Sequence, residues 1–165
     1  MRVLIFISSL LWSASLAVAE PFSADKAMEQ ITSIVAKSGL RPKVESLGCR
    51  EAQVPEAERE CLYVDYGDIS FELKSGPHSE FRAAIVEGPK LLDNHGGYLG
   101  AVMEVIDPTL LPDERKKYVD RVLKQYSERP TDPVYISVSS PVFRHTVIIL
   151  NPHTARLIIA RPTKK

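Results

Sequence analysis

Runs of apolar residues at helical and at alternating spacing divide most of the chain into short elements. The first helical face is marked by five apolar residues: Ala27, Met28, Ile31, Ile34 and Val35. This spacing predicts a helix that packs one side on a sheet. Ser23 precedes the run as a candidate N-cap, and Gly39 follows it where helices often end.

Most of the remaining pattern is typical of strands. The strand-like segments are 43–49, 61–66, 69–74, 98–106, 134–138, 142–150 and 155–161. Residues 112–126 begin with Pro112 and carry apolar residues along one side. This pattern predicts a second main helix. Residues 80–87 fit a strand or a short helix, and 89–94 fit a short helix, so this part stays open.

A hairpin with a defined register is predicted between residues 61–66 and 69–74. Gly67-Asp68 suits a two-residue turn. With that turn, one face of the hairpin is entirely apolar: Leu62, Val64, Tyr66, Ile69, Phe71 and Leu73. Cys61, Tyr63 and Glu72 then lie on the opposite face, away from the helices.

The last two strands contain unbroken apolar runs, at 147–150 and 157–160. Such runs predict strands that are covered on both faces and lie centrally in a sheet. The expected fold is therefore α+β, a mostly antiparallel sheet with two main helices packed on it. This order of elements is similar to that of small secretion-chaperone-like proteins, and a shared layout by itself implies no function.

The first 19 residues are typical of a secretory signal peptide. Arg2 is followed by a short apolar run, and Ala17-Val18-Ala19 supplies small residues before a cleavage site at Glu20. Serines interrupt the run, which makes a membrane anchor the weaker interpretation. We therefore expect a signal peptide over 1–19 and one exported domain over 20–165, in the periplasm or outside the cell, with no membrane span.

Composition narrows the classes of partner and cofactor. The chain has 165 residues with 21 basic and 21 acidic side chains, so a nucleic-acid partner lacks electrostatic support. The two cysteines, Cys49 and Cys61, predict one disulfide in an oxidising compartment. Because their spacing is not that of a metal site and no histidine is close in sequence, we expect neither a metal nor another cofactor.

Histidine is the best starting point for any catalytic hypothesis. The four histidines are scattered, and only His95 lies among polar and flexible neighbours, in Asp93-Asn94-His95-Gly96-Gly97. A general base needs such surroundings, but a loop that leads into the strand at Tyr98 is the preferred interpretation of the segment. Ser23-Ala24-Asp25-Lys26 matches Ser-x-x-Lys without its companion motifs. We predict no catalytic residues.

The most distinctive segment is the polar stretch between the two cysteines. It holds four glutamates, Glu51, Glu56, Glu58 and Glu60. A disulfide at its base would order the segment and lower the entropic cost of binding. We therefore predict a possible partner-binding loop made of these glutamates with Tyr63 and Glu72. An ordinary solvated loop, whose disulfide only stabilises the domain, is the alternative and is slightly favoured.

Three functions are compatible with these observations. The first is an exported, non-catalytic binding protein, such as an inhibitor or an immunity-type partner of an envelope protein or toxin. The second is an accessory subunit of an envelope assembly, and the third is a small hydrolase that uses His95. The first is preferred because no catalytic constellation is found.

Overall fold

The computed structural model describes residues 21–53, 57–65 and 69–162. The predicted signal peptide and the Gly67-Asp68 turn lie outside these residues. The helices are α1 (Ala24–Lys37), a 3-10 turn η1 (Pro89–Leu92), α2 (Asp93–Ile106) and α3 (Pro112–Ser127). The strands are β1 (Val44–Glu51), β2 (Arg59–Asp65), β3 (Ile69–Ser75), β4 (Phe81–Gly88), β5 (Val134–Ser139), β6 (Arg144–Asn151) and β7 (Thr154–Ala160).

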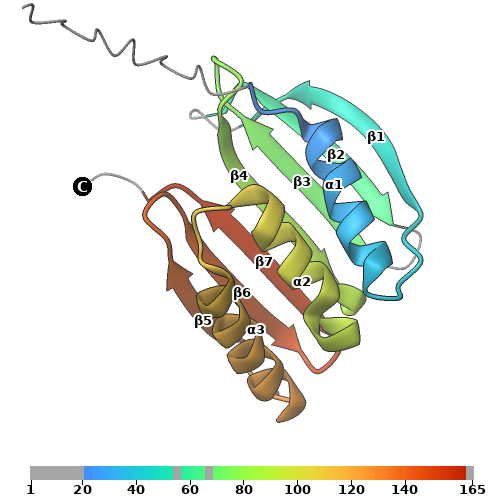
Figure 1. Cartoon of the computed structure of the whole chain (residues 1–165), viewed down its shortest axis with the longest axis vertical. Coiled ribbons are helices and arrows are strands. Elements are labelled where there is room, and N and C mark those ends of the chain that lie inside the picture. The colour runs from blue at the N-terminus through green and yellow to red at the C-terminus, as the bar shows by residue number, and fades with distance from the viewer. Residues whose placement is uncertain (1–20, 54–56, 66–68, 163–165) are drawn as a thin grey trace, which may run out of the picture.

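The strands form one antiparallel sheet in the order β1-β2-β3-β4-β7-β6-β5. All three α-helices lie on the same face, with α1 over the β1–β3 side and α3 over the β5–β6 side (Figure 1). The expected α+β fold with a mostly antiparallel sheet is confirmed. Among the described residues, no helix has the length and apolar character needed to cross a bilayer.

The first helix forms where its pattern predicts. The Ser23 hydroxyl accepts a hydrogen bond from the Lys26 amide, so this residue is the N-cap. The residues that α1 buries are Ala27, Met28, Ile31 and Val35. Gly39 follows with a φ of 88°, a conformation that glycine adopts without steric cost.

The segment predicted as a strand over 98–106 is instead the helix α2, and this expectation is wrong. Its apolar residues are nearly continuous because α2 lies between α1 and α3 and also packs on the sheet. A helix enclosed on several sides loses the one-sided pattern that would identify it. Residues 80–87 form the strand β4, and 89–92 form the short helix η1.

The predicted register of the first hairpin is wrong by one residue. Asp65 pairs with Ile69, Tyr63 with Phe71, and Cys61 with Leu73. A one-residue slip moves every side chain of one strand to the other face. Cys61 and Tyr63 therefore lie on the helix-covered face and are 5% and 3% exposed, whereas Leu62 and Val64 point away from the helices.

One buried tyrosine joins α3 to the sheet. The Tyr118 hydroxyl donates to the Ile136 carbonyl on β5 at 2.7 Å and accepts from the Val147 amide on β6 at 3.0 Å. Both backbone groups belong to residues that pair across the two strands. The side chain thus fixes α3 against the β5–β6 end of the sheet.

Candidate functional site: the uncovered face of the sheet

The face of the sheet opposite the helices is covered by none of the described helices. Because side chains alternate along a strand, the register decides which residues point there. Tyr135 of β5 points there and is 68% exposed. Five large aliphatic residues at regularly paired positions point there as well: Leu62, Val64, Ile85, Ile148 and Ile158. All five are half-buried by their neighbours, and none belongs to the apolar cluster under the helices. We call this surface the open face.

The apolar runs of the last two strands are explained by this arrangement. Val147, Ile149, Leu157 and Ile159 are buried under the helices, whereas Ile148 and Ile158 alternate with them toward the open face. The expectation that both faces of these strands are covered is therefore wrong for the described chain. The central position is correct for β7, which lies between β4 and β6.

A network of ion pairs occupies one side of the open face. Glu60 accepts from Arg50 at 2.6 Å and lies 3.6 Å from the Lys74 ammonium, which also contacts Glu72 at 2.5 Å. Burial by itself would raise the pKa of Glu60, whose side chain is only 4% exposed. The two cations outweigh that effect, so the pKa is lowered and Glu60 is charged at neutral pH.

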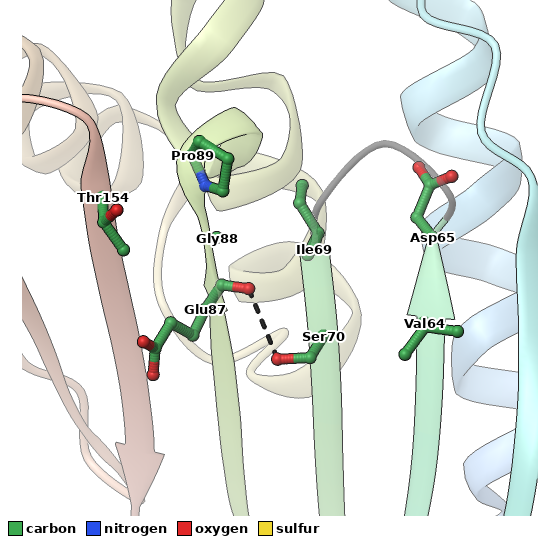
Figure 2. A pocket seen from close by; sticks show the side chains of 8 residues that line it. All are labelled: Val64, Asp65, Ile69, Ser70, Glu87, Gly88, Pro89 and Thr154. Atoms are coloured by element: carbon green, nitrogen blue, oxygen red, sulfur yellow. Dashed lines mark hydrogen bonds between the residues drawn. The ribbon is translucent and has the colours of Figure 1, made fainter.

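A hollow of about 520 Å³ lies at one end of the open face (Figure 2). It is lined by Val64, Asp65, Ile69, Ser70, Glu87, Gly88, Pro89 and Thr154. Glu87 is paired with Arg156 of β7 at 2.5 Å, and the Ser70 hydroxyl donates to the Glu87 carbonyl. The hollow therefore offers polar groups next to the apolar centre.

The Asp65 carboxylate beside this hollow is occupied by bonds within the protein. It accepts a 2.9 Å bond from the Lys43 amide and a short bond from the Tyr98 hydroxyl. Burial and the bond to Asp65 both raise the pKa of Tyr98. Asp65 therefore holds α2 against the end of β2.

Both edges of the sheet are modified in ways that discourage strand addition. On β1, a bulge interrupts the ladder between Ser46 and Gly48, and Glu45 and Arg50 add exposed charge. On β5, Arg121 of α3 donates a 2.8 Å hydrogen bond to the Ser137 carbonyl. The open face, and not an edge, is therefore the surface best suited to contact another molecule.

The glutamate-rich segment does not form a single acidic surface. Glu51 and Glu58 are exposed, whereas Glu60, which was predicted as part of the binding loop, is buried in its ion pairs. Glu56 lies outside the described residues. Glu72 is paired with Lys74. Binding by this loop remains a prediction. Glu60 and Glu72 are held in ion pairs, so the loop has fewer free carboxylates to offer a partner than the sequence indicated.

Tyr63, predicted beside that loop, belongs to the core on the helix side. Its hydroxyl donates to Asp25 of α1 at 2.7 Å. Burial and this bond raise the pKa of Tyr63. The one-residue error in the register is the reason that Tyr63 was expected at the surface.

The predicted disulfide is present. Cys49 and Cys61 face each other across β1 and β2, with an S–S distance of 2.04 Å. It was expected on the side away from the helices, and this is wrong. The two sulfurs lie beside the first residues of α1, where they line a small hollow with Phe22 and Ala24. Together these contacts link the edge strand to the core.

His95 has no partner that would make it a base. It lies exposed at the start of α2, where Asn94, His95 and Gly96 all have positive φ angles of 47°, 58° and 73°. Among the residues that the structure describes, its side chain makes no hydrogen bond. The segment around His95 was expected to lead into a strand, but the helix α2 begins there instead.

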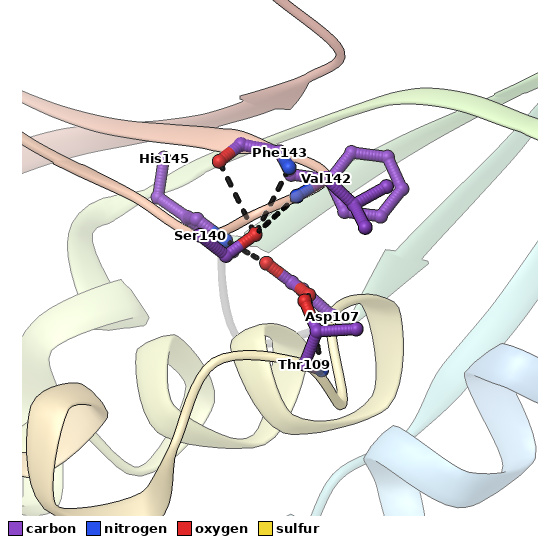
Figure 3. Close-up of polar contacts among 6 residues, drawn as sticks. All are labelled: Asp107, Thr109, Ser140, Val142, Phe143 and His145. Carbon is purple, nitrogen blue, oxygen red and sulfur yellow. Dashed lines mark hydrogen bonds and ion pairs between the residues drawn. The ribbon is translucent and has the colours of Figure 1, made fainter.

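A second histidine, His145, forms a buried pair with Asp107 (Figure 3). Its Nε2 lies 2.7 Å from the Asp107 carboxylate, and both residues are fully buried. The other carboxylate oxygen accepts from the Thr109 amide and hydroxyl at 3.1 and 2.5 Å. The pair thus joins the end of α2 to β6 in the core.

Although Ser140 lies near this pair, the three residues are not a catalytic triad. In a triad the serine bonds to the histidine and the aspartate to the other ring nitrogen. Here the Ser140 hydroxyl donates to the Phe143 carbonyl, and the His145 Nδ1 is buried without a partner among the described residues. No base therefore activates the hydroxyl, and full burial closes the pair to a substrate.

The buried pair predicts a loss of stability in mild acid. Burial lowers the pKa of His145 below its usual 6.5, although Asp107 opposes this shift. As the pH falls through 6.5, the unfolded chain takes up a proton that the folded chain resists, so the free energy of unfolding decreases. Burial by itself would raise the pKa of Asp107, but hydrogen bonds from Ser140, Thr109 and His145 outweigh it, so this pKa is lowered. The free energy of unfolding therefore continues to decrease below pH 4, where Asp107 is protonated more readily in the unfolded chain.

Urea unfolding at a series of pH values between 7.5 and 5 measures this slope. The His145→Gln variant should lose most of it, whereas the exposed-site variant His153→Gln should retain it. An equal slope in all three proteins would show that His145 is not the titrating group.

Comparisons with protein-family models, with curated proteins and with solved structures found no match. The described residues also contain no group of histidine, cysteine and acidic side chains that could hold a metal ion. The function is therefore inferred from the geometry of the open face.

Proposed function

We propose that this protein is exported and acts by binding another protein chain across the open face, without chemistry of its own. The observation that carries the proposal is the uneven cover of the sheet. Three helices bury one face, whereas the other presents five large aliphatic side chains and Tyr135, with ion pairs at the border. An apolar centre with a polar rim is typical of protein interfaces.

Export supports the proposal from the sequence side. Residues 1–19 have the pattern of a signal peptide, and the disulfide is suited to an oxidising compartment. An inhibitor or an immunity-type partner of an envelope protein or toxin is the kind of molecule that would use such a surface.

Site-specific photocrosslinking in cells tests the proposal. A photoreactive amino acid at Ser70 or Arg144, both exposed on the open face, should form adducts with a protein. The same group at Glu29 of α1 or Lys124 of α3, exposed on the helix side, should form at least ~10-fold fewer, because contact is confined to one face. Adducts from the helix side alone, or from neither side, would contradict the proposal.

A further inference from the structure

The distribution of charge on the open face differs between its two halves. The strands β1–β4 place the cations Arg50 and Lys74 there together with four glutamates: Glu45, Glu60, Glu72 and Glu87. Glu87 is also paired with Arg156 across β4 and β7. The strands β5–β7 place two arginines there, Arg144 and Arg156, and no acidic residue. Arg82, at the bulge of β4, is paired with Glu80.

A surface with one acidic and one basic half is complementary to itself. From this division we infer that the chain that occupies the open face is a second copy of this protein. The two sheets would pack face to face, related by a twofold axis that runs parallel to the strands beside β4. Rotation about this axis places β1 of one copy opposite β5 of the other. The strands β1–β3, with three glutamates and two cations, then meet the strands β5–β7, with two arginines. Glu87 of β4 lies near the axis and stays paired with Arg156 of its own copy. This inference rests on the proposed function.

The centre of the face supplies the apolar contact that such a dimer needs. Ile85 lies on β4, the middle strand, and Ile158 of β7 is its direct neighbour. Strands about 4.8 Å apart and same-face positions about 6.8 Å apart give a face of roughly 30 by 20 Å. Because side chains make the surface uneven, its accessible area is larger than this flat rectangle. That area approaches the ~800 Å² that each partner buries in a standard interface.

The apolar runs of β6 and β7 favour the same conclusion. Ile148 and Ile158 have the sequence pattern of covered residues, and none of the described elements covers them. A second copy would cover both without adding a strand at either edge. The bulge on β1 and the Arg121 bond on β5 disfavour that other mode of self-association.

Molar mass measured by light scattering tests the inference on the full chain after processing in the cell. We expect twice the mass of one copy and a dimer that weakens as salt is added. Ile85→Asp should raise the dissociation constant at least ~30-fold, which corresponds to about 2 kcal/mol. Leu111→Asp, a similar change at an exposed site on the helix side, should leave the dimer intact. Arg144→Glu, at an exposed position, should weaken it as well and serves if Ile85→Asp does not fold.

The position of the axis has its own measurement. The native cysteines form a disulfide, and the described residues contain no free cysteine, so one introduced cysteine can carry a spin label. Labels at Ile85→Cys should lie close together, because stacked sheets are about 10 Å apart. Labels at Ser137→Cys on β5 should lie roughly 30 Å apart, since β5 is three strands from β4.

The possible failures are distinguishable. A single copy at all concentrations, or Ser137→Cys labels that lie close together, would overturn the dimer or its axis. Photocrosslinked adducts from the open face with a different protein would then preserve the proposed function. Absence of any adduct from that face would remove both.

Discussion

Replacing Asp107 with alanine should lower the free energy of unfolding by about 3–5 kcal/mol. The change removes the acceptor for the His145 ring and for both donors of Thr109. The His145 donor is left in the core, where an unpaired polar group costs the free energy of its lost hydration. Thr109 is exposed, so its two donors can bond to water instead. Urea unfolding followed by circular dichroism measures the effect.

Asp132→Ala is the matched control, because Asp132 is exposed in the loop before β5. It should change the free energy of unfolding by less than ~0.5 kcal/mol. A similarly small effect for Asp107→Ala would mean that the pair contributes no net stability. That result would also remove the basis for the predicted slope in mild acid.

Loss of the disulfide should cost about 3 kcal/mol. Cys49 and Cys61 are 12 positions apart, and replacing both with serine frees the chain between them in the unfolded state. The structure adds a second cost, because Cys61 is buried next to α1 and a hydroxyl there is poorly accommodated. Chemical unfolding of the wild type with and without a reductant provides the comparison.

The loss should be uneven across the sheet. The edge strand β1 pairs only with β2, so its amides should exchange with solvent much faster in the Cys49→Ser, Cys61→Ser variant. Amides of β7, which lies between two strands, should change far less. Uniform acceleration across both strands would indicate that the disulfide stabilises the whole domain and not the edge.

The sequence alone determined those features that depend on neighbouring residues. A one-sided apolar period and a capping serine were enough for α1, because both signals act within a few residues. The same holds for α3, which begins at Pro112, and for the turn between β6 and β7 at Pro152. The disulfide followed from an even cysteine count in a chain with a signal pattern.

Only the tertiary structure decided which side of each element is covered. The apolar content of α2 was visible, but its helical form comes from enclosure between two other helices and the sheet. A shift of one residue in the pairing of β2 with β3 decides whether Tyr63 or Leu62 faces the core. The pairing of Asp107 with His145 joins positions 38 residues apart, which no local pattern encodes. The open face arises for the same physical reason: burial belongs to the assembled sheet, and the chain records only which residues are apolar.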